Sequence, residues 1–150
     1  MAGGGTHSYA VDSLTNRYTA IDGQTISHDA AGNLTQGEAG CVYFWDYENR
    51  LMRIEDDIGG AVATFDYDAL GRRVRKVDAA AGETTLYYYN PDWQCLEERS
   101  GAGTLLRSFV YGNYIDEVLL MDDGADRYYA HDHLYSPAAL LSAAGAVLER

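Results

Sequence analysis

Short runs of alternating apolar and polar residues recur along most of the chain. Residues 51–55 and 73–77 alternate in this way, and an alternation with a period of two places successive side chains on opposite faces of a β-strand. Further strand-like runs cover residues 41–45, 61–65, 84–89, 105–111, 118–121 and 127–129. Only residues 137–144 suggest a helical turn. The pattern predicts an all-β fold, an antiparallel meander of hairpins that forms a curled sheet.

Turn-forming residues separate these runs in a repeated order. An Asp is followed three residues later by Gly or Asn. Such an Asp accepts a hydrogen bond from a backbone N–H two residues on, while the Gly or Asn adopts a positive φ. The residues with this predicted structural role are Asp29, Asp46, Asp68, Gly32, Asn49 and Gly71. The Arg residues that close three such turns, Arg17, Arg50 and Arg72, are expected to pair with the Asp of a neighbouring unit.

The turns recur at nearly constant intervals. The anchors lie at Asp12, Asp29, Asp46, Asp68, Asn90 and Gly112, which gives separations of 17, 17, 22, 22 and 22 residues. A fixed period near 20 residues is typical of repeat proteins, in which each unit depends on its neighbours to bury its apolar side chains. About six strand–turn–strand units therefore make up the chain.

Composition and charge narrow the possible functions. The 13 Tyr and 16 Gly favour strands and turns, and the net charge of −12 argues against nucleic-acid binding. No apolar run is long enough to insert in a membrane, and the first residues do not resemble a signal peptide. Cys41 and Cys95 are isolated thiols in strand-like runs, where we expect inert side chains.

Two sets of residues resemble a known family. Residues 28–34, 48–51 and 67–74 are similar to the repeats of the RHS/YD-repeat family. The segment from Tyr128, and above all the element Asp132, His133, Leu134, Ser136 and Pro137, resembles the start of the RHS repeat-associated core domain. On this basis, residues 1–8 are expected to be a flexible segment, residues 9–126 the repeats, and residues 127–150 the start of the core element.

The resemblance implies a structural role. Members of the family wind their repeats into a shell that encloses a C-terminal cargo, often a toxin, and are usually secreted or exposed at the cell surface as much longer proteins. The expected partners of this chain are therefore the remainder of a longer RHS polypeptide or its cargo. About six units are too few to close a shell, so self-association through open sheet edges is also expected.

The chain departs from the family pattern at several places, among them Ala130 and Ala138, which stand where the family often has His and Arg. The family can cleave itself after an Asp-Pro-x-Gly element, which does not occur in these 150 residues. Tyr135 takes the place of a usual Gly. If that position has a positive φ, a Tyr there strains the turn by about 1–2 kcal/mol.

Catalytic chemistry has little support. His131 and His133 would share one face of a strand and could meet a metal ion, but the sequence suggests no third ligand, so a structural role in the turn is favoured. Adjacent carboxylates such as Glu97 and Glu98 point to opposite faces of a strand and do not converge as in a glycosidase. No catalytic residue, cofactor or metal is predicted.

Aromatic residues offer the alternative function. Rows of exposed Tyr and Trp bind sugar rings or anchor a protein partner, although such rows more often pack between strands. The candidate binding residues are Tyr88, Trp93, Tyr111 and Tyr128. The alternative is therefore a carbohydrate- or protein-binding surface module.

Overall fold

The computed structural model describes residues 6–114 and 116–149, and they form β-structure almost throughout. The strands are β1 (Tyr9–Val11), β2 (Tyr18–Ile21), β3 (Gln24–Thr25), β4 (Ser27–His28), β5 (Leu34–Gln36), β6 (Val42–Trp45), β7 (Leu51–Glu55), β8 (Ala61–Tyr67), β9 (Arg73–Asp78), β10 (Glu83–Tyr89), β11 (Cys95–Ser100), β12 (Leu105–Tyr111), β13 (Val118–Asp122), β14 (Asp126–His131), β15 (Pro137–Ser142) and β16 (Val147–Glu149). A 3₁₀ turn, η1 (Glu38–Gly40), is the one helical element within the described ranges. None of the helical structure described there is long and apolar enough to cross a membrane.

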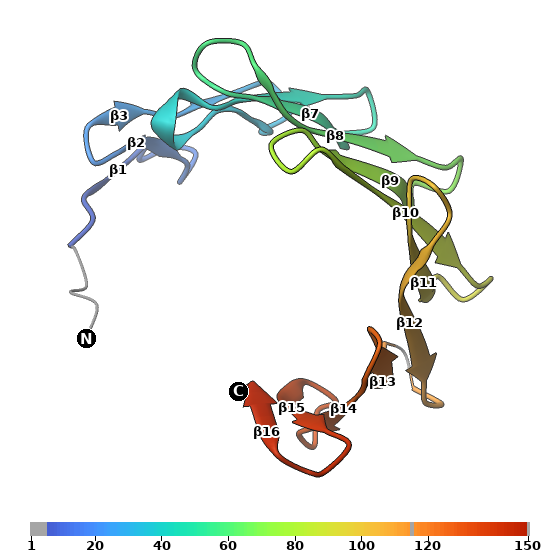
Figure 1. Cartoon of the computed structure of the whole chain (residues 1–150). Coiled ribbons are helices and arrows are strands. Elements are labelled where there is room, and N and C mark those ends of the chain that lie inside the picture. Colours follow the sequence, from blue (N-terminus) through green and yellow to red (C-terminus); the bar gives the residue numbers. More distant parts are fainter. Residues whose placement is uncertain (1–5, 115, 150) are drawn as a thin grey trace. The chain divides into compact units, whose positions relative to one another are not determined.

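The strands form two antiparallel sheets. Strands β1 to β3 make a small sheet, and β4 to β16 follow one another in chain order through a 13-stranded meander (Figure 1). This sheet is open, with β4 and β16 as its outer strands. The all-β meander predicted from the alternating pattern is confirmed.

The predicted helical turn at residues 137–144 is wrong. Pro137 to Ser142 form strand β15, in which Leu140 pairs with Tyr129 and Leu141 with Tyr128 of β14. The Ala-rich segment has little intrinsic preference for a strand, so pairing with the preceding strand decides its conformation. Pro137 stands at the first position of the strand, where the missing N–H is tolerated.

The chain divides into two compact units. Unit 1 comprises residues 1–66 and 77–82, and unit 2 comprises residues 67–76 and 83–150. This division differs from the predicted boundary after residue 126, which stays a prediction. Of the expected flexible segment, residues 1–5 lie outside the described residues, whereas the backbone N–H of Ser8 donates to the Asp22 carboxylate at 2.7 Å.

Few side chains are fully buried. Among the described residues, the buried hydrophobic side chains are Ile26, Ala63 and Phe65, all in unit 1. The described strands of unit 2 all belong to one sheet, so no second layer of described residues within that unit covers either face. The sheet is held together by its hairpins rather than by a closed apolar core.

Candidate functional site

The predicted turns form one recurring five-residue structure, which we call the repeat turn. In the turn from Asp68 to Arg72, the N–H of Asp68 donates to the carbonyl of Arg72 at 2.9 Å. One carboxylate oxygen of Asp68 accepts the N–H groups of Leu70 and Arg72, both at 2.9 Å. Gly71, at the fourth position, has a φ of 84°. This is a three-residue hairpin loop closed by a left-handed residue, and the first side chain organises it.

The same turn recurs along the sheet. It begins at Asp29, Asp46, Asp68, Asn90 and Asp132, and its fourth position is held by Gly32, Asn49, Gly71, Trp93 and Tyr135, all with positive φ. Sequence analysis missed three further copies, which begin at Asp56, Ser100 and Ser142. The signal that would have revealed them is the Gly three residues after each first residue.

The closing Arg pairs within its own turn, contrary to the prediction. Arg50 Nε donates to Asp46 Oδ2 and Arg72 Nε donates to Asp68 Oδ2, both at 2.7 Å. The turn brings its fifth residue back over its first, so the nearest carboxylate is its own. Neighbouring turns are linked in another way, because Arg72 Nη1 also donates to the carbonyl of Asn90 at 3.1 Å.

The turns of unit 1 are also linked to one another. Asn33 Nδ2 donates to Asn49 Oδ1 at 2.7 Å, which joins two successive repeat turns. The guanidinium of Arg17 lies against Gly32, where a Cβ atom would approach Nη2 to 2.5 Å. Gly32 therefore provides both a positive φ of 97° and the space for this arginine.

The turn that begins at Gly112 obtains its carboxylate from elsewhere. Gly112 has no side chain, and the Glu117 carboxylate lies against it, in the position that a Cβ atom would take. The N–H of Tyr114 donates to Glu117 Oε2 at 3.2 Å, as the third residue of a repeat turn donates to its Asp. Glu117 thus supplies the carboxylate that an Asp supplies in the other turns, so a turn still forms where the first residue is Gly112.

The hydrogen bonds stabilise the charged form of the turn carboxylates. The side-chain amide of Asn33 donates to Asp29 and lowers its pKa, although partial burial opposes the shift. At Asp68, partial burial would raise the pKa, but the N–H and guanidinium of Arg72 outweigh it and the pKa is lowered. These Asp residues therefore act as ionised hydrogen-bond acceptors rather than as acids at neutral pH.

The segment that resembles the start of the RHS core domain is built on a repeat turn. Asp132 accepts the N–H of Leu134 at 2.8 Å and that of Ser136 at 3.0 Å. Tyr135 has a φ of 62°, so the position that favours Gly keeps its left-handed conformation with a Tyr in it. Strand β14 ends at His131, so His133 lies in the turn and the two imidazoles do not alternate along one strand as the metal-site hypothesis required. Pro137 begins the next strand.

The four candidate binding residues do not form a continuous row of adjacent side chains. Tyr88 on β10 and Tyr128 on β14 are separated by four strand spacings, about 19 Å. Trp93 lies in a turn. Tyr111 is half-buried, and its hydroxyl donates to the carbonyl of Cys95 at 3.0 Å. The predicted stripe is therefore divided between strands and a turn, and Tyr111 has a packing role.

The remaining candidates for chemistry lack converging groups. Within residues 6–114 and 116–149, no three His, Cys, Asp or Glu side chains gather as metal ligands would. Burial raises the pKa of the Cys95 thiol, so it is protonated and unreactive at neutral pH. Glu97 pairs with Arg99 and Glu98 with Arg107, so this adjacent pair of carboxylates is engaged in separate ion pairs.

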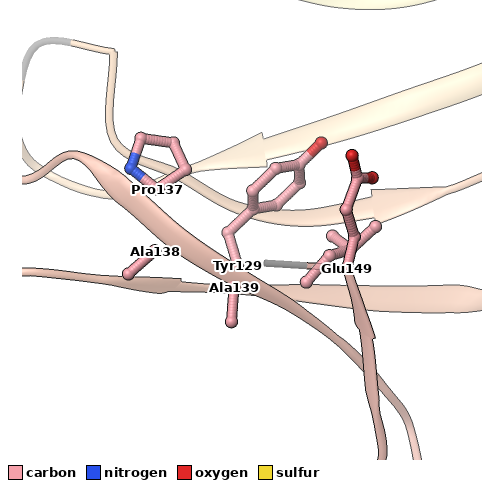
Figure 2. A pocket seen from close by; sticks show the side chains of 6 residues that line it. Tyr129, Pro137, Ala138, Ala139 and Glu149 are labelled. Atoms are coloured by element: carbon pink, nitrogen blue, oxygen red, sulfur yellow. The ribbon is translucent and has the colours of Figure 1, made fainter. Parts of the chain in front are cut away.

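A shallow pocket lies beside the last two strands (Figure 2). Its volume is about 260 Å³, and it is lined by Tyr129, Pro137, Ala138, Ala139, Leu140 and Glu149. The Tyr129 hydroxyl and the Glu149 carboxylate point toward the same side in Figure 2. With mainly small apolar side chains and a single carboxylate, the pocket offers packing space rather than a catalytic pair.

Comparison with known proteins supports the repeat assignment. The family described as RHS Repeat matches residues 45–84, which contain the repeat turns closed by the Asp46–Arg50 and Asp68–Arg72 pairs. Similar proteins include the tRNA3(Ser)-specific nuclease WapA of Bacillus spizizenii (27% identical over 134 residues, 86% of this chain and 5% of the relative). The tRNA nuclease WapA of Bacillus subtilis strain 168 is 30% identical over 105 residues, 67% of this chain and 4% of the relative.

The matched region is a small part of these relatives. A third similar protein, the tRNA(Glu)-specific nuclease WapA of Bacillus subtilis subsp. natto, is 31% identical over 104 residues, 66% of this chain. The chain spans about 4–5% of the length of the curated relatives it matches. The repeat turns and the match over residues 45–84 agree, so the chain belongs to the RHS-repeat family.

Proposed function

We propose that this chain is a wall segment of an RHS shell, which encloses or presents a cargo and has no enzymatic activity of its own. The observation that carries the proposal is the exposure of apolar side chains on a single-layer sheet whose turns are internally hydrogen-bonded. In unit 2, for example, Tyr88, Val110 and Tyr128 are 48%, 53% and 42% exposed on their strands. Such a sheet becomes stable when a further surface covers it.

The nature of the cargo is inferred from the similar proteins. The names of the three relatives describe tRNA nucleases, and the region they share with this chain covers about 4–5% of their length. We assign the nuclease activity to other parts of such polypeptides and the enclosing role to this repeat segment. The proposed partners are the remainder of an RHS polypeptide and a toxic cargo, and the proposed location is the cell surface or the medium.

A buried nitrogen of His131 also favours the presence of a covering segment in the longer polypeptide. His131 Nε2 is buried and has no hydrogen-bond partner among the described residues. Buried polar nitrogens are normally paired, with protein or with an ordered water. A covering segment of the longer polypeptide that repacks the side chains over His131 would supply such a partner.

The test compares the isolated chain with its natural polypeptide. Hydrogen exchange should show slow exchange in β10 to β14 of the full polypeptide and faster exchange of the same amides in the isolated chain. The isolated chain should leave tRNA intact. Cleavage of tRNA by the pure chain, a natural reading frame without a cargo region, or equal exchange in both forms would contradict the proposal.

The alternative of a carbohydrate-binding module has weaker support. Tyr88 and Tyr128 lie too far apart to stack on adjacent sugars. Retention of the chain on a polysaccharide, lost on Tyr88→Ala, would favour it over the wall segment.

A further inference from the structure

The two ends of the strands in unit 2 carry different side chains. At one end, the turns present Leu70, Trp93, Tyr114, Leu134 and Tyr135, which are 46–70% exposed and which we call the aromatic rim. At the other end, the central turn residues at 101–103, 123–125 and 143–145 are Gly, Ala and one Asp. Among the described turn residues of unit 2, the large exposed apolar side chains therefore lie at this end of the strands, whereas at the other end the exposed Leu105 and Val147 begin strands.

Successive turns of the rim contact each other. The guanidinium of Arg72 lies 5.8 Å from the centre of the Trp93 ring and also donates to the carbonyl of Asn90. Farther along, the Tyr114 and Tyr135 rings stack with centroids 4.2 Å apart and planes 16° apart. The rim thus presents rings that neighbouring turns hold in place.

Two rim residues occupy positions that suit them poorly. Trp93 and Tyr135 have φ values of 69° and 62° at the fourth position of a repeat turn. Gly71 and Gly32 hold the equivalent position elsewhere without strain. Because the backbone at these positions is strained and the rings are exposed, we infer that the rings have a role in binding rather than in stabilising the turn.

The charge around the rim indicates the kind of ligand. The turns at 90–94, 112–117 and 132–136 contain no Lys or Arg, and their carboxylates belong to Asp92, Asp116, Glu117 and Asp132. Asp92 and Asp116 are exposed. Trp93 already has the Arg72 guanidinium 5.8 Å from its ring centre, just as Arg73 lies 4.7 Å from the centre of the Tyr87 ring. Among the described residues, no cation of the chain is placed over the Tyr114–Tyr135 stack.

We propose that the aromatic rim binds an Arg- or Lys-bearing segment of another protein. The cations would lie on the outer faces of the stacked Tyr114 and Tyr135 rings and on the face of Trp93 opposite Arg72, and the exposed carboxylates would pair with neighbouring charges. The net charge of −12 attracts a basic partner from a distance. This role goes beyond the wall segment, since it concerns the strand ends and holds with or without an enclosed cargo.

The test is a titration of the intact chain with a synthetic peptide. The probe is a nine-residue peptide with Arg at alternate positions and Ser between them, and the matched peptide has Gln in place of Arg. We expect saturable 1:1 binding of the Arg peptide, at least tenfold weaker binding of the Gln peptide, and a marked loss of affinity in high salt. Trp93 fluorescence and amide chemical shifts of the rim turns report the site.

Substitutions at the strained positions distinguish an effect on peptide affinity from an effect on the stability of the fold. Trp93→Gly and Tyr135→Gly should each reduce affinity at least fivefold while the melting temperature stays equal or rises, because Gly adopts a positive φ without strain. Tyr135→Asn is a second variant, since Asn49 holds the same position in another turn. The matched control is Tyr47→Ser, which removes a ring that is 90% exposed in unit 1 and should leave affinity unchanged.

Several results would overturn the proposal. Wild-type affinity in both Gly variants would mean that the peptide binds the acidic surface at large. A melting temperature lowered by several degrees in both Gly variants would show that the rings stabilise the turns. Equal binding of the Gln peptide, displacement by a neutral oligosaccharide, or dimerisation that depends on Trp93 would each identify a different ligand.

Discussion

At the residue scale, one side chain organises each turn. The carboxylate of Asp68 accepts two backbone N–H groups and the guanidinium of Arg72, so a single residue satisfies donors that a tight turn would leave unpaired. Asn90 and Ser142 show that an uncharged acceptor also builds the turn. The chemistry that the turn requires is an acceptor oxygen at the first position, and the negative charge adds the ion pair with Arg.

Removing that acceptor should destabilise the hairpin. Asp68→Ala leaves the N–H groups of Leu70 and Arg72 without their acceptor, and we expect the melting temperature to fall by roughly 2–8 °C. Asp68→Asn keeps an acceptor oxygen and loses the ion pair, so its effect should be smaller. A thermal melt followed by circular dichroism measures both. An unchanged melting temperature in Asp68→Ala would refute the structural role of the turn Asp.

The left-handed position should be equally sensitive. Gly32→Ala places a Cβ atom on a backbone with a φ of 97° and against the Arg17 guanidinium, whereas Gly145→Ala has a φ of 77° and no neighbour within 4 Å. Each substitution should cost about 1–2 kcal/mol of strain. Urea denaturation should show a larger loss for Gly32→Ala, because Arg17 must also move. Equal losses would indicate that the Arg17 contact contributes nothing.

At the element scale, the hairpin and its turn form the repeating unit. Each turn is closed by its own residues, while links such as Arg72 to Asn90 and Asn33 to Asn49 join it to the next turn. The Gly112 turn shows that the unit tolerates the loss of its first side chain when Glu117 supplies the carboxylate. The repeats therefore keep the same hydrogen-bond pattern even where a different residue supplies the acceptor.

The turn carboxylates predict how stability depends on pH. The pKa values of Asp12, Asp29, Asp46 and Asp68 are lowered from the ordinary value of 3.8. A lowered pKa in the folded state means that these groups stabilise the fold fully above pH 3.8 and lose this contribution as the pH falls through the lowered values. Urea midpoints should therefore show no loss from these groups between pH 7 and 5, and a decline below about pH 4.

A matched variant isolates this contribution. Asp68→Asn cannot titrate, so its decline in acid should be shallower than that of the wild type. If the wild type and the variant lose stability in parallel below pH 4, the acid sensitivity arises outside this turn.

At the scale of the whole molecule, many large apolar side chains are exposed to solvent. The buried hydrophobic side chains among the described residues are three, and the described strands of unit 2 have no second layer of their own. The outer strands β4 and β16 also end the 13-stranded sheet without a further neighbour in it. A surface of this kind fits a segment that is covered in a larger assembly, as the wall-segment proposal requires.

This exposure predicts weak cooperativity in the isolated chain. Since little apolar area is buried, urea unfolding should have a slope near the lower end of the usual range, about 1 kcal/mol/M. Light scattering coupled to gel filtration should detect larger species that form through open edges. A cooperative monomer with a slope of about 3 kcal/mol/M would contradict this prediction and favour an independent module.

Local sequence determined the elements of this protein, because a strand alternation and an Asp followed by Gly three residues later are set by neighbours in the chain. The turns at Asp29, Asp46 and Asp68 and the strand class were predictable for that reason. Pairing with β14 decided that Pro137 to Ser142 form a strand, and the backward fold of each turn decided which carboxylate Arg72 meets.

The surfaces were decided only by the tertiary structure. Strand order separates Tyr88 from Tyr128, and the alternation of hairpins brings Trp93, Tyr114 and Tyr135 to the same end of the strands. Spacing along the chain does not contain this information, because residues about 20 positions apart become neighbours only when the strands between them pair. The sequence by itself determined the repeat, and the pairing of the strands decided which side chains the repeat presents together.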